Sequence, residues 1–131
     1  MNPSRILVVI AISIARARGA TTSANVSVFA GSGNCWTYGD GAQLQGATSF
    51  NAPSAVCVDT KGYVYIAETY AHYVRVVRGS YIEAYAGVAG WYGTFGNGGF
   101  ATQAGLNNPS DVFCHPNGNI YIAGTGVCRL F

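Results

Sequence analysis

Four cysteines and two histidines are the side chains of this sequence best suited to metal binding or redox chemistry. A structural zinc site usually pairs cysteines about two to four residues apart, and no pair here has that spacing. The histidines are far apart in the chain and fall at different places in the pattern described below. We therefore predict no metal site, no cofactor and no enzyme activity. The residues are Cys35, Cys57, Cys114, Cys128, His72 and His115.

Aromatic rings between glycines form a second candidate group, because flat rings supply large contact areas for ligands. They lie in a glycine-rich segment, residues 87–109, and loops longer than about 15 residues are usually functional or packed by their own side chains. The rings could pack the loop or form an exposed ligand platform. We favour packing, since glycines let a loop fold tightly on itself. The candidate binding residues are Trp91, Tyr92, Phe95 and Phe100.

Single polar residues carry weaker signals. Asp40 is a possible calcium ligand, but it precedes Gly41, and an Asp-Gly pair is more typical of a turn. Asp59 and Lys61 flank a predicted hairpin, so we expect both in solvent. Asn25 begins a glycosylation sequon, which is a candidate modification site if the chain is secreted.

Residues 1–20 resemble a secretory signal peptide. Arg5 gives a positive start, residues 6–14 are apolar apart from Ser13, and residues 15–17 form a small-x-small cleavage site. The alternative is a short membrane anchor, but the apolar run is far below the roughly 20 residues needed to span a bilayer. We expect an extracellular protein without a membrane span in its mature part.

The remaining residues, 21–131, carry four basic and five acidic side chains, a net charge of 4 − 5 = −1. That charge gives no basic footprint for nucleic acid and no charged run for a membrane surface. Half of the whole chain is hydrophobic, and it holds 18 glycines and 9 tyrosines. This composition is typical of short strands and tight turns rather than of disorder.

The chain repeats itself at an offset of 56 residues. The stretch 62–69 (GYVYIAET) returns as 118–125 (GNIYIAGT). Two shorter stretches also return, 51–54 (NAPS) as 107–110 (NNPS) and 29–31 (FAG) as 85–87 (YAG). Each pair is 56 residues apart, as in 85 − 29 and 109 − 53. The offset holds over the whole span without a gap. A period of this size indicates propeller blades or a solenoid.

One period contains four strand signals joined by short turns. We predict strands at residues 55–59, 63–68, 73–78 and 81–86, the last two joined by a two-residue loop that starts with Gly79. A second unit, 111–131, repeats the first three strands. The apolar runs are nearly continuous, which is typical of strands that are covered on both faces. The predicted fold is all-β, with β-propeller-type, four-stranded antiparallel blades at 55–86 and 111–131.

These stretches resemble the NHL-repeat family of β-propellers. The blade motif of that family appears here as 53–59 (PSAVCVD), 62–69 (GYVYIAET), 72–75 (HYVR) and 85–87 (YAG), and its inter-blade linker as 96–109 (GNGGFATQAGLNNP). The resemblance covers residues 26–131. It departs from the motif in the second unit, where His115 replaces Asp59, Gly124 replaces Glu68 and Cys128 replaces His72.

The two ends of the repeat region complement one another. Residues 26–30 match a fourth strand, whereas the second unit stops within its third, so two blade-equivalents lie in permuted register and cannot close a ring of about four to eight. We predict either the front part of a longer NHL propeller or head-to-tail assembly by strand exchange into a ring or filament. The candidate assembly strand contains Val26, Val28 and Phe29, and the candidate open edge contains Val127, Arg129 and Phe131.

The repeat also constrains the disulfides, of which four cysteines allow three pairings. Cys57 aligns with Phe113 and not with Cys114, so the two cysteines point to opposite faces of their sheets. Cys114 and Cys128 fall two strand spacings apart, roughly 9.5 Å, beyond disulfide reach. A partner in another blade or chain is preferable for Cys128, and Cys35 is the candidate.

The functional prediction is a secreted, non-catalytic module that binds protein or glycan, or a structural subunit that binds copies of itself. The resemblance also implies an alternative, since some NHL-type propellers are similar to metal-dependent lyases with histidines at the ring centre. His72 and His115 do not occupy equivalent blade positions, so we place that alternative second.

Overall fold

The computed structural model of this chain describes residues 29–32, 37–44, 48–125 and 127–130, with the side chains of 127–130 excepted. The predicted signal segment, Asn25, Val26, Val28, Cys35 and Phe131 lie outside these residues. The same holds for the side chains of Val127, Cys128 and Arg129.

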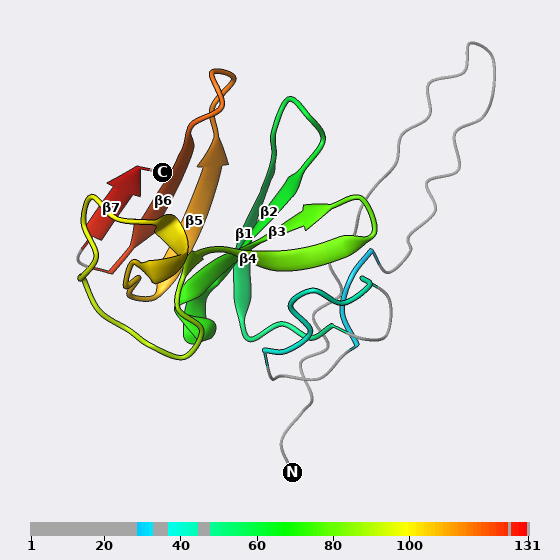
Figure 1. The fold of residues 1–131 in the computed structure, drawn as a ribbon, viewed down its shortest axis with the longest axis horizontal. Coiled ribbons are helices and arrows are strands. Elements are labelled where there is room, and N and C mark those ends of the chain that lie inside the picture. Colours follow the sequence, from blue (N-terminus) through cyan, green and yellow to red (C-terminus); the bar gives the residue numbers. More distant parts are fainter. Residues whose placement is uncertain (1–28, 33–36, 45–47, 126, 131) are drawn as a thin grey trace, which may run out of the picture.

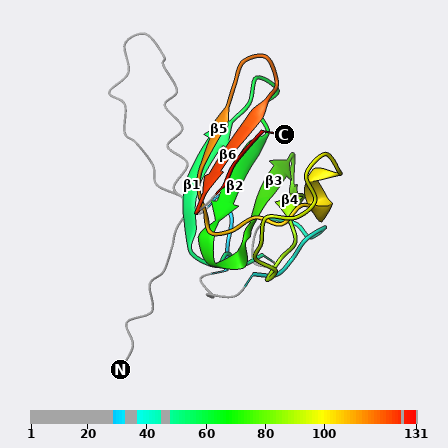
Figure 2. The same ribbon diagram turned by 90° about the vertical axis from the view of Figure 1, so that its left-hand side faces the viewer.

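Within the described residues, seven strands form two antiparallel sheets that pack beside each other (Figures 1 and 2). The first sheet has four strands in the order β1-β2-β3-β4 and the second has three in the order β5-β6-β7. Each strand pairs with its neighbour in the sequence. The all-β prediction and the four-stranded first sheet are confirmed. The strands are β1 (Pro53–Val58), β2 (Val64–Glu68), β3 (Tyr73–Arg78), β4 (Tyr81–Gly87), β5 (Pro109–Cys114), β6 (Ile120–Gly124) and β7 (Val127–Leu130).

The 56-residue repeat is visible in the hydrogen-bond register. In the first sheet the register shifts between Pro53 and Ala55, and in the second it shifts between Pro109 and Asp111. These bulges let both strands begin two residues earlier than the sequence predicts, because each proline still faces a partner on the next strand. The residue before each proline has a positive φ in both units, 50° and 43°.

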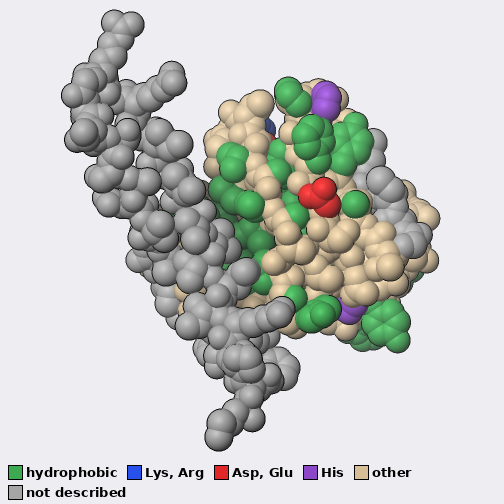
Figure 3. Space-filling model, turned by 180° about the vertical axis from the view of Figure 1, so that it is seen from behind, with side chains coloured by type: hydrophobic (Ala, Val, Ile, Leu, Met, Phe, Trp, Pro, Cys, Tyr) green, Lys and Arg blue, Asp and Glu red, His purple; other side chains and the backbone are tan. Residues whose placement is uncertain are grey.

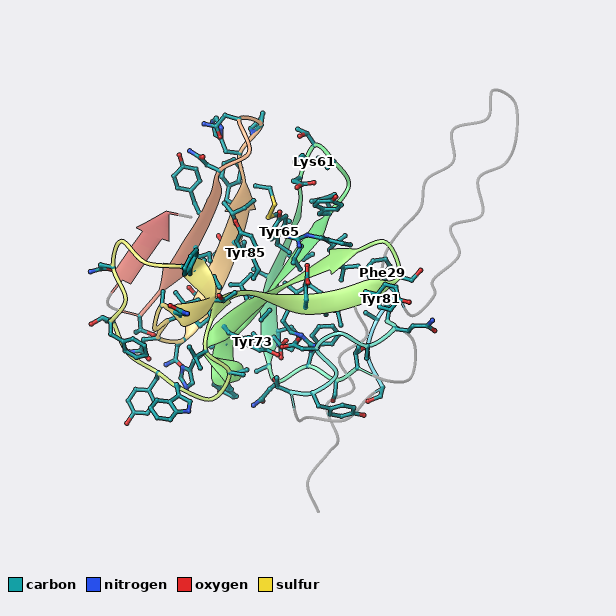
Figure 4. The ribbon with its side chains drawn as sticks, in the orientation of Figure 1. Phe29, Lys61, Tyr65, Tyr73, Tyr81 and Tyr85 are labelled. Carbon is teal, nitrogen blue, oxygen red and sulfur yellow. A yellow bond between two sulfur atoms is a disulfide. The ribbon has the colours of Figure 1, made fainter. Side chains whose placement is uncertain are left out.

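The two central strands of the first sheet, β2 and β3, are buried on both faces, as their continuous apolar runs predict. One face supplies Tyr65, Ala67 and Val76 to a core shared with Ile122 of the second sheet. The other face packs Ile66, Val77 and Ile82 under Ala30, Leu44 and Phe50 from the segment that precedes β1. Side chains alternate along a strand, so adjacent residues of β2 enter different cores. Figure 4 shows Tyr65 and Tyr85 between the two sheets, with ring centroids 4.8 Å apart.

A disulfide between Cys57 and Cys114 joins β1 to β5 across this shared core. The sequence correctly places the two cysteines on opposite faces of equivalent sheets. When such sheets stack, opposite faces of neighbours meet, and the cysteines therefore face each other. The bond also rules out a Cys114–Cys128 pairing, as predicted, and leaves the Cys35–Cys128 pairing a prediction.

The segment 88–108 between the sheets contains one short 3-10 helix, η2 (Ala101–Gln103). Another, η1 (Thr69–Ala71), joins β2 to β3. Phe29 and Ala30, the described end of the predicted assembly strand, lie outside the named strands. The buried Ala30 nevertheless corresponds to the buried Ala86 of β4.

Candidate functional site

An arginine and a glutamate are fully buried beside the first sheet. Glu68 ends β2, and Arg75 lies in β3. The Arg75 Nη1 atom is 3.4 Å from Glu68 Oε1, and its Nε atom donates to Asp40 Oδ1 at 2.8 Å. The Asp40 side chain is 42% exposed. We refer to these three residues as the charge clamp.

The remaining bonds of the charge clamp run to the segment before β1. Arg75 donates from Nη1 to the Ser49 carbonyl at 3.0 Å and from Nη2 to the Tyr38 carbonyl at 3.2 Å. Glu68 Oε2 accepts the Thr37 hydroxyl at 2.6 Å and the backbone N–H of Asn51 at 2.8 Å. The buried charges are paired and hydrogen-bonded, which is the condition under which charges can be buried.

Aromatic rings enclose the guanidinium of the charge clamp. The Arg75 Cζ atom is 5.3 Å from the ring centroid of Phe50 and 5.9 Å from that of Tyr73, within the range of cation–π attraction. Tyr73 lies at the end of the first sheet where the segment before β1 crosses it (Figure 4). The charge clamp therefore binds that segment to the sheet, and its charged groups have a structural role.

Burial raises the pKa of Glu68 above its ordinary value of 4.5, against the opposing effects of Thr37, the Asn51 N–H and Arg75. A carboxyl with a raised pKa in the folded state holds its proton more tightly there than in the unfolded chain. Its contribution to stability is fully present below pH 4.5 and is lost as the pH rises through the folded pKa.

We expect a Glu68→Gln variant to remove this pH dependence. The free energy of unfolding of the unmodified protein, minus that of the variant, should fall as the pH rises from below 4.5 to neutral. Urea unfolding over a pH series measures the difference. A difference that rises with pH would show that the charge partners outweigh burial in setting this pKa.

The two histidines serve as hydrogen-bond acceptors within the fold. His72 Nδ1 accepts the backbone N–H of Asn108 at 3.2 Å, and His115 Nδ1 accepts that of Asn117 at 3.2 Å. His115 lies in the β5–β6 hairpin, where it takes over part of the role of Asp59. Within the described residues, no three His, Cys, Asp or Glu side chains are grouped to hold a metal ion.

Asp59 lies at the surface, as expected, and it also closes the β1–β2 hairpin through hydrogen bonds. Its Oδ1 atom accepts the N–H groups of Lys61 and Tyr63, both at 2.9 Å, and its Oδ2 atom accepts the Tyr65 hydroxyl at 3.2 Å. Desolvation opposes these bonds, but together they lower the pKa of Asp59 below 3.8. An aspartate that binds the N–H two residues on is a common turn device.

The aromatic loop, residues 91–100, has a fixed backbone and exposed rings. The Trp91 N–H donates to the Val88 carbonyl at 2.9 Å, and the Gly93 N–H donates to the Leu106 carbonyl at 3.1 Å. The side chains of Trp91, Tyr92 and Phe100 are between 69% and 76% exposed. The favoured packing interpretation is therefore wrong for these three rings.

Phe95 is 47% exposed, less than the other three rings, and one side of its ring packs against glycines of the segment. A Cβ atom on Gly105 would lie 2.7 Å from the Phe95 ring, and one on Gly93 would lie 2.9 Å from it. The Gly105 N–H donates to the Phe95 carbonyl at 2.9 Å. Glycines next to an aromatic ring thus let this part of the loop fold tightly, as the sequence suggests.

The charge clamp is the buried polar feature that sequence reasoning missed. The sequence predicts Asp40 as a turn residue, and it predicts Glu68 and Arg75 as parts of a strand motif. A signal was available, because a glutamate and an arginine on adjacent predicted strands of a low-charge chain are candidates for a buried pair. The second unit has Gly124 in place of Glu68, and a Cβ there would lie 2.7 Å from the Asn107 carbonyl oxygen.

Among the described residues, no helix has the length and apolar character that crossing a membrane requires. No protein-family model and no curated protein sequence matches the chain. A solved structure does: a structural genomics protein of unknown function from Bacteroides thetaiotaomicron, with 22% identity and a TM-score of 0.68. The match covers 77% of this chain and 25% of the other, so this chain corresponds to about a quarter of that protein's length. At this identity the likeness shows the fold alone.

Proposed function

We propose that this chain is a secreted, non-catalytic NHL-repeat module that binds extracellular protein or glycan through its aromatic loop. The observation that supports this function best is the exposure of Trp91, Tyr92 and Phe100 on a hydrogen-bonded backbone. Rings held in place lose little conformational freedom on binding, so their contact area contributes to affinity. A sugar ring presents an apolar face of C–H groups that stacks on such rings.

His72 helps to hold the loop against the first sheet. Its ring centroid is 5.5 Å from that of Tyr92, and its Nδ1 accepts the N–H of Asn108 at the far end of the segment. The Gly90 N–H also donates to the Ala71 carbonyl at 2.9 Å. The loop is therefore tied to η1 at several points, which supports a preformed surface.

Binding of the full chain to a panel of glycans and extracellular proteins tests the proposal. We expect the Trp91→Ala, Tyr92→Ala double variant to bind its ligand at least about tenfold more weakly, since buried aromatic anchors dominate interface energies. The matched control is Tyr81→Ala, which removes an exposed ring from the β3–β4 hairpin. Equal binding by both variants would refute the assignment to this loop.

A structural subunit that assembles head to tail is the second candidate. It is favoured by the difference in burial between equivalent faces of the two sheets, described below. Strand exchange of residues 26–30 with the edge at 127–131 remains a prediction, since most of those side chains lie outside the described residues. The other alternative is the front part of a longer NHL propeller with lyase-type activity. The match to a quarter of a longer chain supports the idea of a longer protein, and no observation supports the lyase activity.

A further inference from the structure

Equivalent faces of the two sheets share a tyrosine and an alanine on the second strand but differ in burial. Tyr65 and Ala67 of the first sheet are buried beneath the second sheet. Their repeat partners, Tyr121 and Ala123, lie on the outer face of the second sheet, where Tyr121 is partly exposed and Ala123 is exposed. On the same face Phe113, the partner of Cys57, is 57% exposed.

The outer face also carries an aromatic group. Phe113 pairs with Tyr121 in the register, and their ring centroids are 6.3 Å apart. The His115 ring lies 6.2 Å from each of them. Viewed from behind, hydrophobic side chains gather close to a histidine on this side of the molecule (Figure 3). Asp111, which replaces Ala55, adds one charge, and its Oδ1 atom accepts the N–H of Val112 at 2.8 Å.

A pair of hydroxyl groups fixes the second sheet to the first. Ser54 Oγ and Thr69 Oγ1 both donate to the carbonyl oxygen of Pro109, at 3.2 Å and 2.8 Å. The repeat places Ser110 and Thr125 at the corresponding positions of the second sheet, and both residues are exposed. Within the chain Ser110 Oγ donates to the Ala123 carbonyl over a long 3.5 Å, and it would exchange this bond in binding the start of another sheet.

The complementary surface lies on β1. Val112 is 4% exposed, and Cys114 is bonded to Cys57, because the first sheet covers that face of β5. Their repeat partners on β1, Val56 and Val58, are 53% and 58% exposed. The first sheet therefore leaves open the two positions that the second sheet uses to bind its neighbour.

The segment over the rest of this face follows the same plan. The repeat relates the residues that cover the two sheets at an offset of 56. Those over the first sheet are Ala30, Gly31 and Phe50, and their partners beside the second sheet are Ala86, Gly87 and Leu106. Gly31 and Gly87 both have positive φ values, 108° and 90°. The face of the first sheet that carries Val56 and Val58 therefore matches the face by which the second sheet packs on the first.

We propose that the outer face of the second sheet binds the β1 face of the first sheet in a second copy of the chain. Phe113 of one copy packs on Val58 of the next, where the Cys57–Cys114 bond joins the sheets within a chain. Ser110 and Thr125 donate to the carbonyl of Pro53, the repeat partner of Pro109. The inference rests on the assembly function proposed above and assigns its contact surface.

Such a contact uses different faces on the two copies, so it generates a ring or an open fibre. If the angle between copies repeats the angle between the two sheets, the assembly closes as a propeller. Propellers have about four to eight blades. With two sheets per copy, closure takes about two to four copies.

Sedimentation velocity of the full chain and of two single variants tests the inference. We expect the unmodified chain to self-associate, and Phe113→Asp or Val58→Asp to raise the dissociation constant at least about 30-fold, as for an interface hot spot. Both side chains are more than half exposed, so thermal unfolding should confirm that the variants fold. Tyr81→Asp, an exposed ring on β4 at the opposite edge of the first sheet, should associate as the unmodified chain does.

Mixing the two variants gives the sharpest outcome. Each keeps one intact half of the contact, so a mixture of Phe113→Asp and Val58→Asp chains should form a one-to-one complex that grows no further. If the chain associates but these variants do not weaken it, assembly stands and this contact surface is refuted. If the chain is monomeric at every concentration, the assembly function and this inference both fail, and a further repeat unit of a longer chain becomes the occupant of this face.

Discussion

Replacement of Arg75 by methionine is expected to lower the free energy of unfolding by about 3–5 kcal/mol, the usual effect of removing one partner of a buried ion pair. Arg75 and Glu68 have no exposed side-chain surface. Without Arg75, the Glu68 carboxylate keeps the Thr37 and Asn51 donors but loses its cation in a site that excludes water. Urea unfolding followed by tryptophan fluorescence or circular dichroism measures the change.

The exposed ion pair of Arg78 and Glu83 supplies the matched control. It joins adjacent strands of the same sheet, but both side chains are nearly half exposed. Because exposed pairs contribute about 0–1 kcal/mol, Arg78→Met should cost no more than about that amount. Similar losses for the two variants would contradict the structural role assigned to the charge clamp.

The pH dependence of the Arg75→Met deficit provides an independent check. Below pH 4.5 the Glu68 carboxyl is neutral in the folded and unfolded states and no longer needs a cation. The deficit should therefore shrink as the pH falls. A deficit that is constant with pH would indicate that the lost packing of the long arginine stem on Phe50 and Tyr73, and not the lost charge, sets the cost.

Loss of the Cys57–Cys114 bond is expected to lower the free energy of unfolding by about 4 kcal/mol. The bonded residues are 57 apart in the sequence, and closing a loop of that length restricts the unfolded chain by about this amount in the chain-entropy description. The bond also joins the two sheets at an edge strand of each, β1 and β5. Its loss leaves the shared core and the Pro109 hydrogen bonds to hold the sheets together.

A Cys57→Ser, Cys114→Ser variant tests this bond, with Cys35→Ser, Cys128→Ser as its control. The first variant should show the full loss in oxidising buffer. The control keeps Cys57 and Cys114, so adding a reductant should lower its free energy of unfolding by this amount. Mass spectrometry of non-reduced peptides should recover the Cys57 and Cys114 peptides linked together. Recovery of either cysteine linked to another partner would overturn the pairing.

Local sequence signals determined the strands of this protein. A strand is indicated by apolar residues a few positions apart, and a hairpin by turn residues such as Gly79. These local signals predicted the strands, and the 56-residue repeat showed the same strand order twice. The same signals could not fix strand ends at Pro53 and Pro109, because a bulge depends on the register with the neighbouring strand. They also showed that Cys57 and Cys114 lie on opposite faces, without showing that those faces meet.

The sequence by itself therefore determined an all-β repeat with two units and the opposite facing of Cys57 and Cys114. The tertiary structure decided what covers each face. Tyr65 and Tyr121 have nearly the same neighbours in sequence, yet one is buried and the other partly exposed, because burial depends on the element stacked above. The charge clamp depends in the same way on a segment far away in sequence, and a repeat gives no information about contacts that only one of its copies makes.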